Sequence, residues 1–318
     1  MHIVQIAHEP IPISLYGGTE RIIENLCLGL ASLGHKIALI SFKGDYTLEG
    51  IDFKDLGQFS KAEANFRFTE LIPNDADIIH FHLPMSQDQM DLGGIPYICT
   101  LHGNLKEGES LDKLPKNTIC ISENHATRHK RSTYVYNGLD ENKIPLYDKS
   151  FQSADYFSFL GKTSLKRKGL HLAKKIAKTF KVPLHIGGGK GLNLFGSKYL
   201  GYLNNDEKAK LLGESKALLF PILWEEPFGL VMIEAMFTGT PVFALDRGSV
   251  PEVLGQPGSD DLFIYEKTIE KLITSIKEFK PCTPNRYRQY AIQYFSKNVM
   301  CENYLIIYEK ICSGEEIG

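Results

Sequence analysis

The sequence predicts an α/β protein with two parallel sheets, and three observations lead to this prediction. Short apolar, β-rich runs alternate with longer stretches of helical period, which is the pattern of repeated βαβ units. The alternation occurs in two series, separated by a polar stretch at residues 146–150 that we interpret as a linker. The length of 318 residues corresponds to about two domains of ordinary size.

The first series predicts an open α/β domain over residues 1–147. Its expected strands are residues 3–7, 36–42, 78–81, 97–101, 118–121 and 133–136. After the first strand, the chain passes Gly17 and Gly18 and enters a helix. The apolar side chains of Ile22, Leu26 and Leu30 recur there at every fourth position.

The second series predicts another open α/β domain over residues 148–298. Its expected strands are residues 156–160, 183–186, 217–221 and 241–245, and its expected helices are residues 170–180 and 230–237. A last helical pattern follows at residues 299–311. We expect the C-terminal segment, residues 299–318, to form a helix that packs across a domain surface.

Composition excludes several classes of protein. With 36 Lys and Arg against 38 Asp and Glu, the formal charge is −2, so the sequence does not predict a nucleic-acid partner. Apolar runs are too short to cross a membrane and the N-terminus does not resemble a signal peptide, which predicts a cytoplasmic location. The six cysteines form no C-x-x-C pair and are expected to be reduced thiols.

Four short motifs do not support their usual functions. Leu192 stands where a dinucleotide-binding glycine is needed after GGGKG (residues 187–191), and the Ser-Lys order of residues 197–198 reverses that of a Walker A motif. Asp75 and Asp77 precede their strand and are interpreted as solvated turn residues. His80 and His82 share one strand face, but no third ligand is nearby, so we expect no metal site.

The segment WEEPFGLVMIEAM (residues 224–236) carries the strongest chemical signal. Glu226 directly precedes the predicted helix, Glu234 lies inside it, and Gly229 leaves the first N–H groups unobstructed. A helix start of this kind suits an anion such as a phosphate, while the two carboxylates can accept hydrogen bonds from sugar hydroxyls. The alternative is that both are ordinary carboxylates near a helix start.

This segment resembles the signature of family 4 retaining glycosyltransferases, whose E-x7-E element matches Glu226 and Glu234. Other segments resemble the same family in the expected order: YGGTER (16–21), DIIHFH (77–82), TLHG (100–103), VYNGLD (135–140) and the LGK to KG stretch (160–169). The resemblance extends from the first residue to about residue 253. It implies the GT-B fold, in which two Rossmann-like domains face a central cleft.

The resemblance also implies a function. The chain would move a sugar from a nucleoside diphosphate sugar to an unknown sugar, lipid or small-molecule acceptor, with retention at the anomeric carbon and without metal or cofactor. His102 and Glu226 would be the catalytic residues, and Glu234 would bind the donor ribose. The donor diphosphate would be bound by Gly17, Gly18, Lys162, Lys168, Phe228, Gly229 and Leu230.

One departure from the family pattern leaves alternatives open. Lys162 stands where the family usually has arginine, so the positive charge is kept and the bidentate fork is lost. Lys166 or Arg167 could compensate. The alternatives are a nucleotide-sugar epimerase, a phosphorylase of the same fold, or a catalytically weak nucleotide-sugar-binding subunit.

A basic run at residues 128–131 bears on a further partner. It follows Ser122, a candidate helix cap, and could form a basic helix face for an anionic membrane surface. We favour a solvated face over peripheral membrane contact, because one short cluster is less than membrane binding usually needs.

Overall fold

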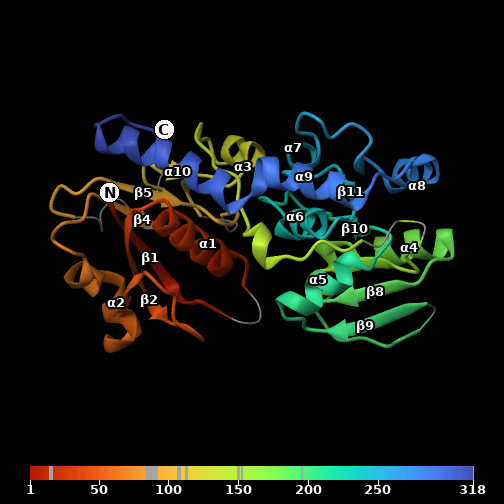
Figure 1. The fold of residues 1–318 in the computed structure, drawn as a ribbon, viewed down its shortest axis with the longest axis horizontal. Helices are drawn as coiled ribbons and strands as arrows, with labels where there is room; N and C mark the ends of the chain where they lie inside the picture. The colour runs from red at the N-terminus through yellow and green to blue at the C-terminus, as the bar shows by residue number, and fades with distance from the viewer. Residues whose placement is uncertain are drawn as a thin grey trace. The chain divides into compact units, whose positions relative to one another are not determined.

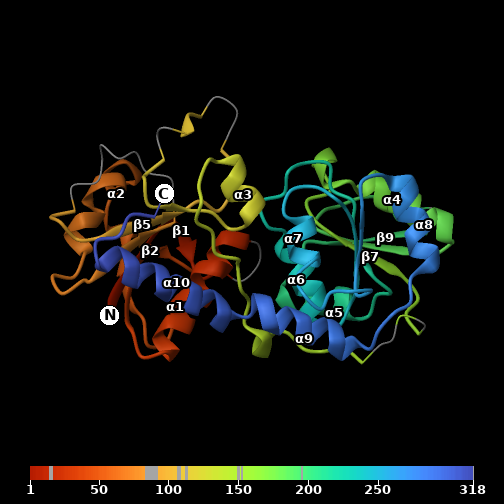
Figure 2. The same ribbon diagram turned by 90° about the horizontal axis from the view of Figure 1, so that it is seen from above.

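The computed structural model describes residues 1–13, 17–82, 92–105, 109–111, 114–148, 151, 153–194 and 196–317. The chain divides into two compact units (Figures 1 and 2). Unit 1 comprises residues 1–138 and 297–318, and unit 2 comprises residues 139–296. Each unit holds one six-stranded sheet whose strands pair in parallel, so the α/β prediction is confirmed.

The sheet of unit 1 has the order β3-β2-β1-β4-β5-β6. Its strands are β1 (His2–Ile11), β2 (Lys36–Lys43), β3 (Asp52–Asp55), β4 (Ile78–Phe81), β5 (Tyr97–Thr100) and β6 (Thr118–Ile119). This is the strand order of a doubly wound Rossmann-like sheet, and the winding reverses between β1 and β4. Ligands of such sheets bind outside the carboxyl ends of the strands at that reversal.

Helices cover both faces of this sheet. The helices of unit 1 are α1 (Gly18–Ser32), α2 (Lys61–Arg67), α3 (Glu123–Arg128) and α10 (Lys297–Cys312). Figure 1 shows α1 and α10 side by side, and these two helices pack against one another. Side chains alternate along β1, so Val4 and Ile6 join a core with Ala64 and Phe68 of the α2 region. Gln5 therefore points to the opposite face, which α1 and α10 cover.

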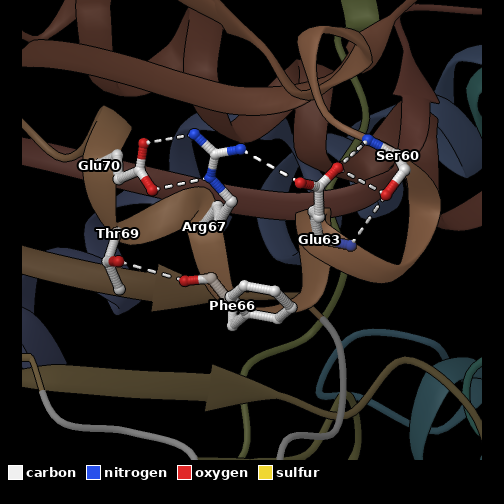
Figure 3. Close-up of polar contacts among 6 residues, drawn as sticks. All are labelled: Ser60, Glu63, Phe66, Arg67, Thr69 and Glu70. Carbon is white, nitrogen blue, oxygen red and sulfur yellow. Dashed lines mark hydrogen bonds and ion pairs between the residues drawn. The ribbon is translucent and has the colours of Figure 1, made fainter.

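Local hydrogen bonds define the start of α2 (Figure 3). Ser60 Oγ accepts the Glu63 N–H at 3.4 Å, and Glu63 Oε2 accepts the Ser60 N–H at 3.0 Å, which makes a capping box. Arg67 then donates to Glu63 at 3.2 Å and to Glu70 at 2.8 Å. Thr69 Oγ1 donates to the Phe66 carbonyl oxygen at 3.1 Å. This short helix is thus stabilised by contacts within about ten residues of sequence.

The sheet of unit 2 has the order β12-β11-β10-β7-β8-β9. Its strands are β7 (Phe157–Leu160), β8 (Leu184–Gly187), β9 (Ser197–Gly201), β10 (Leu218–Phe220), β11 (Val242–Leu245) and β12 (Ile264–Glu266). Counted along the chain within unit 2, this is the same winding as in unit 1, and it reverses between β7 and β10. The prediction of two Rossmann-like domains is confirmed.

Six helices lie in the part of unit 2 that the structure describes. They are α4 (Leu170–Phe180), α5 (Asn205–Gly213), α6 (Leu230–Phe237), α7 (Val250–Leu254), α8 (Ile269–Glu278) and α9 (Pro284–Phe295). A buried core joins α4 and α8 to one face of the sheet, through Phe157, Ile176, Phe243 and Leu272 among others. Helices α5 and α6 pack on the other strand faces, and α9 packs on α6.

The elements that the sequence did not predict are mostly edge strands and polar helices. Strands β3, β9 and β12 lie at sheet edges, where exposed side chains remove the continuous apolar run that marks a buried strand. Conversely, the strand expected at residues 133–136 is only a single bridge between Tyr134 and Cys120.

The division into units differs from the expected boundaries of 147/148 and 298/299. Residues 139–148 belong to unit 2 because their backbone is bound there. The Leu139 N–H donates to the Phe295 carbonyl at 3.0 Å, and Arg288 donates to the carbonyls of Glu141 and Ile144 at 2.6 and 2.7 Å. The C-terminal helix α10 belongs to unit 1. Among the described residues, no helix is long and apolar enough to cross a membrane.

Candidate functional site

The carboxyl ends of β7 and β10 bring together two segments of unit 2 that are far apart in sequence. Lys162 follows β7, and Lys168 ends the short turn before α4. Glu226 follows β10 and precedes α6. The two segments touch closely, because an added Cβ on Gly169 would overlap the Pro221 carbonyl oxygen. The Leu223 N–H also donates to the Arg167 carbonyl at 2.8 Å.

This contact pairs a lysine with a buried carboxylate. Lys168 Nζ donates to Glu226 Oε2 at 2.8 Å, and Trp224 Nε1 donates to the same oxygen at 2.7 Å. Glu226 is only 8% exposed. Two donors on one oxygen hold the carboxylate group in a single orientation, and the positive charge of Lys168 offsets the cost of burying a negative one.

Two positively charged side chains lie over the indole ring of Trp224. The Arg167 guanidinium carbon lies 4.3 Å from the ring centroid, and Lys168 Nζ lies 4.9 Å from it. Both distances are those of cation–π contacts. Arg167 therefore has a defined place beside Lys168, although it is exposed, as are Lys162 and Lys166.

A glycine turn holds the backbone of Glu226. The Gly248 N–H donates to Glu225 Oε2 at 2.9 Å, and the Ser249 N–H donates to the Glu226 carbonyl at 3.0 Å. Gly248 has a φ of 58°, and an added Cβ would overlap the backbone N and O of Glu226. Only glycine fits there without displacing the carboxylate segment.

Replacing Gly248 by alanine is therefore expected to destabilise unit 2 by more than about 3 kcal/mol, from backbone overlap and positive φ together. Gly258 is a matched control, because it has a φ of 82° with open space around its Cβ position. Gly258→Ala should cost about 1 kcal/mol. Denaturant unfolding followed by Trp224 fluorescence measures both variants, and equal losses would contradict this assignment.

The start of α6 lies next to this carboxylate. Gly229 caps the helix with a φ of 85°. The first N–H groups of α6 have no preceding helical turn whose carbonyl oxygens could accept their hydrogen bonds. Phe228 is buried and packs edge-on against Phe295 at 5.8 Å between centroids, so only its backbone is suited to a ligand. Glu234 lies in the middle of α6 and is 6% exposed.

In unit 1, the carboxyl ends of the central strands carry a buried polar network. His82 Nδ1 and His102 Nε2 are 2.9 Å apart, and His82 Nε2 lies 2.6 Å from Gln5 Oε1. Gln5 Nε2 donates to Tyr308 Oη at 3.2 Å. His80 Nδ1 contacts Tyr308 Oη at 2.8 Å, and its Nε2 contacts Thr100 Oγ1 at 2.7 Å. All four ring nitrogens of His80 and His82 thus have hydrogen-bond partners within the protein.

Two histidines of the α3 region hold the segment after His102. His125 Nε2 lies 3.1 Å from the Gly103 carbonyl oxygen, and His129 Nε2 accepts the Leu105 N–H at 3.3 Å. With Cys120 they form the group of possible metal ligands found among the described residues, with ligand atoms within 4.8 Å of one another. Their remaining ring nitrogens contact the Ile121 N–H and the His125 carbonyl, so hydrogen bonds satisfy both rings without an ion.

The basic run at residues 128–131 does not form an exposed basic helix face. Arg128 donates to Asn124 and Asn104 at 2.7 and 2.8 Å, and His129 is buried. Arg131 donates to the carbonyls of Lys130 and Leu114 at 3.2 and 3.3 Å. Lys130 is exposed, outside the helix, with a φ of 52°. The basic helix face that the sequence left open as the less favoured alternative is therefore not formed, and Ser122 caps α3 by accepting the His125 N–H.

Comparison with known families covers most of the chain. Residues 16–143 match the model described as Glycosyltransferase Family 4, and residues 155–294 match the model described as Glycosyl transferases group 1. The chain belongs to glycosyltransferase family 4. Its GT-B fold agrees with this membership, and the family resemblance drawn from the sequence motifs is confirmed.

Curated relatives match this family 4 chain over part of its length. Alpha-maltose-1-phosphate synthase of Mycobacterium tuberculosis is 34% identical over 116 residues, which is 33% of this chain and 30% of the relative. An MMP alpha-(1->4)-mannosyltransferase of Mycolicibacterium hassiacum is 30% identical over 115 residues, 34% of this chain and 28% of the relative. The matches thus span about a third of the length of these relatives.

Solved structures resemble the whole chain. A glycosyltransferase involved in avilamycin A biosynthesis has a TM-score of 0.76 at 17% identity, covering 100% of this chain and 99% of the other. Anabaena HepE in complex with UDP and glucose has a TM-score of 0.71 at 16% identity, covering 98% of this chain and 100% of the other. At these identities the likeness establishes the GT-B fold.

The structure therefore places the site residues expected of a family 4 chain in two groups. Unit 2 brings Lys168 and Glu226 into contact beside the start of α6. In unit 1, His102 follows β5, while Gly17 and Gly18 lie at the start of α1. Tyr16, which shares the glycine motif, lies outside the described residues. Asp75 and Asp77 are exposed, as expected, and bind His2 at the start of β1.

Sequence reasoning missed two groups of residues around these sites. It did not assign Trp224, although this is the only tryptophan of the chain and lies two residues before Glu226. It also missed Gln5, Tyr304 and Tyr308. The two tyrosines were visible as a helical pair one turn apart, but their contact with β1, β4 and β5 depends on the tertiary fold.

Proposed function

We propose that this chain is a retaining glycosyltransferase that moves a sugar from a nucleoside diphosphate sugar to an acceptor. The observation that carries the proposal is the Lys168–Glu226 pair, placed by the reversal of winding between β7 and β10 and next to the start of α6. A phosphate-binding cation, a sugar-binding carboxylate and a helix start are thereby within one short region. The structural neighbour HepE is in complex with UDP and glucose, which supports the same class of donor.

In this proposal the leaving diphosphate is bound by positive groups and N–H donors of unit 2. Lys168 and Lys162 contribute charge, and Arg167 takes the place of the family's usual arginine beside them. The N–H groups at Phe228, Gly229 and Leu230 contribute the positive end of the α6 dipole. These groups stabilise the charge that grows on the diphosphate as the glycosidic bond breaks, so no metal ion is needed. Gly17 and Gly18 approach the phosphate with their backbone.

The carboxylates and His102 bind the rest of the donor. Because Lys168 and Trp224 both occupy Oε2 of Glu226, we assign Oε1 to a hydroxyl of the transferred sugar. Glu234 accepts the ribose hydroxyls, and His102 contacts the sugar near the reacting carbon. We propose that leaving group and acceptor use the same face of the sugar, which gives retention. The acceptor is a sugar, lipid or small molecule, and the cytoplasmic location stays a prediction.

A thermal-shift panel of uridine, guanosine and adenosine diphosphates and their sugars tests the proposal. One of the diphosphates is expected to raise the melting temperature, and the shift should persist in EDTA. Lys168→Met should weaken binding about 10- to 100-fold, because a charge-assisted hydrogen bond contributes about 1.5–3 kcal/mol. Lys175→Met is the control, since Lys175 pairs with Glu270 on the exposed side of α4 at 3.1 Å.

The donor found in this way then serves for a turnover assay. Release of the nucleoside diphosphate with an early product of retained anomeric configuration, observed by proton NMR, supports a retaining transferase. Conversion of the donor sugar without release would favour an epimerase. The absence of a shift with every ligand would contradict donor binding altogether.

A further inference from the structure

Three polar side chains form a line across neighbouring strand ends in unit 1. Gln5 comes from β1, His82 directly follows β4, and His102 follows β5. Gln5 Oε1 lies 2.6 Å from His82 Nε2, and His82 Nδ1 lies 2.9 Å from His102 Nε2. Gln5 and His82 are buried, whereas His102 is partly exposed.

The proton positions along this line follow from the donor and acceptor chemistry. An amide oxygen only accepts, so Nε2 of His82 must carry the proton that it donates to Gln5. A neutral imidazole has one N–H, so Nδ1 of His82 is an acceptor, and the proton between the two rings belongs to His102 Nε2. Burial lowers the pKa of His82 well below its usual range and the pKa of His102 to about 4, so both rings are neutral at pH 7.

We infer that Gln5 and His82 are positioning residues that hold His102 as its Nε2–H tautomer, with the lone pair on Nδ1. His102 is then a hydrogen-bond acceptor, and it recognises a ligand group that donates, such as a hydroxyl of the donor sugar. Within the described part of the chain, Nδ1 has no hydrogen-bond partner that would occupy this lone pair. The statement about the ligand rests on the proposed function, but the statement about the tautomer does not.

The C-terminal helix holds the other end of Gln5. The amide nitrogen donates to Tyr308 Oη at 3.2 Å, and the Tyr308 hydroxyl also contacts His80 Nδ1 at 2.8 Å. Turning the amide around would reverse the protons along the whole line and place the His102 proton on Nδ1. In the orientation seen here the Tyr308 hydroxyl accepts from the amide nitrogen and is left to donate to His80 Nδ1, so the proton on His80 and the tautomer of His102 are linked through Gln5. A residue 303 positions from Gln5 is thus hydrogen-bonded to the line of side chains that ends at His102.

The first experiment measures the tautomer directly. The protein is labelled with 15N in its histidines, and the ring nitrogens are observed by NMR at pH 7, with His102→Asn identifying the His102 signals. We expect a single neutral form with the proton on Nε2. A proton on Nδ1, an equal mixture of both forms, or a protonated ring would overturn the inference, and this result needs no variant of Gln5 or His82.

Variants then test what sets the tautomer. Gln5→Leu removes the acceptor for His82, so His102 is expected to show both tautomers, and donor turnover should fall about tenfold, the equivalent of one neutral hydrogen bond. Gln5→Glu keeps an acceptor oxygen and should restore the single Nε2–H form. Tyr304→Phe is the matched control on the same helix, because Tyr304 contacts Thr100 at 2.9 Å and not Gln5.

The outcomes separate this inference from the proposed function. If Gln5→Leu retains a single Nε2–H form, Gln5 does not set the tautomer and the inference fails. The same holds if Tyr304→Phe changes the His102 signals as much as Gln5→Leu does. If the tautomer behaves as expected while no nucleoside diphosphate binds, the proposed function fails and the positioning role stands.

Discussion

Glu226→Gln is expected to lower donor turnover at least about 100-fold while leaving the affinity for the nucleoside diphosphate unchanged or stronger. The carboxylate is the group that we assign to the transferred sugar, and a neutral amide is a weaker acceptor and lacks its charge. The same carboxylate also pairs with Lys168 at 2.8 Å. Removing its charge frees that lysine for the diphosphate, so rate and affinity should change in opposite directions.

The neighbouring Glu225 provides the control. It is exposed and accepts the Gly248 N–H at 2.9 Å, and a glutamine there keeps an acceptor oxygen for this contact. Glu225→Gln should therefore retain turnover within a few-fold. The rates come from diphosphate release with the donor identified by thermal shift, and the affinities from titration. Equal turnover in Glu226→Gln and the wild type would remove Glu226 from the site.

Acid is expected to destabilise unit 1 strongly between pH 7 and pH 5. Burial lowers the pKa of His102 to about 4 and that of His125 to about 3, and it lowers the pKa values of His80 and His82 well below 6.5. In this range the unfolded chain binds protons that the folded unit does not. The stability that these neutral rings contribute is complete above pH 6.5 and is lost as the pH falls toward the folded pKa values.

The size of this effect follows from linkage. Each histidine that stays neutral in the folded state costs about 2 kcal/mol on going from pH 7 to pH 5. His102 and His125 together give about 4 kcal/mol, and His80 and His82 increase the loss. Glu20 has the opposite effect on stability. Burial raises the pKa of its carboxyl, so this group favours the folded state as the pH falls, but it is one group against four histidines.

The two units can be followed by different probes. Trp224 is the only tryptophan and lies in unit 2, where burial lowers the pKa of one histidine, His185. Denaturant unfolding at both pH values should show a large acid shift by far-ultraviolet circular dichroism and a smaller shift by Trp224 fluorescence. A dichroism transition that does not move toward lower denaturant at pH 5 would contradict the prediction.

The histidine pairs show how far local pattern extends. The alternation of β4 was enough to predict that His80 and His82 share a face, and their rings do lie 4.1 Å apart between centroids. It did not predict their partners. Those come from β1, β5 and α10, and no local pattern of apolar and polar residues records which strands become neighbours.

The sequence by itself determined the fold class, the central strands and the family. Buried parallel strands need continuous apolar runs, and the E-x7-E element lies within one strand-to-helix segment, so both are readable along the chain. Edge strands β3, β9 and β12 were not predicted, because half-exposed strands do not need such runs.

Only the tertiary structure decided the contacts on which the proposals rest. Lys168 meets Glu226 across 58 residues, and Gln5 meets Tyr308 across 303. It also decided that α10 belongs with the N-terminal sheet. The physical reason is that parallel winding brings the carboxyl ends of non-consecutive strands to one edge. Side chains there find partners by strand order and helix packing, neither of which is set by spacing along the chain.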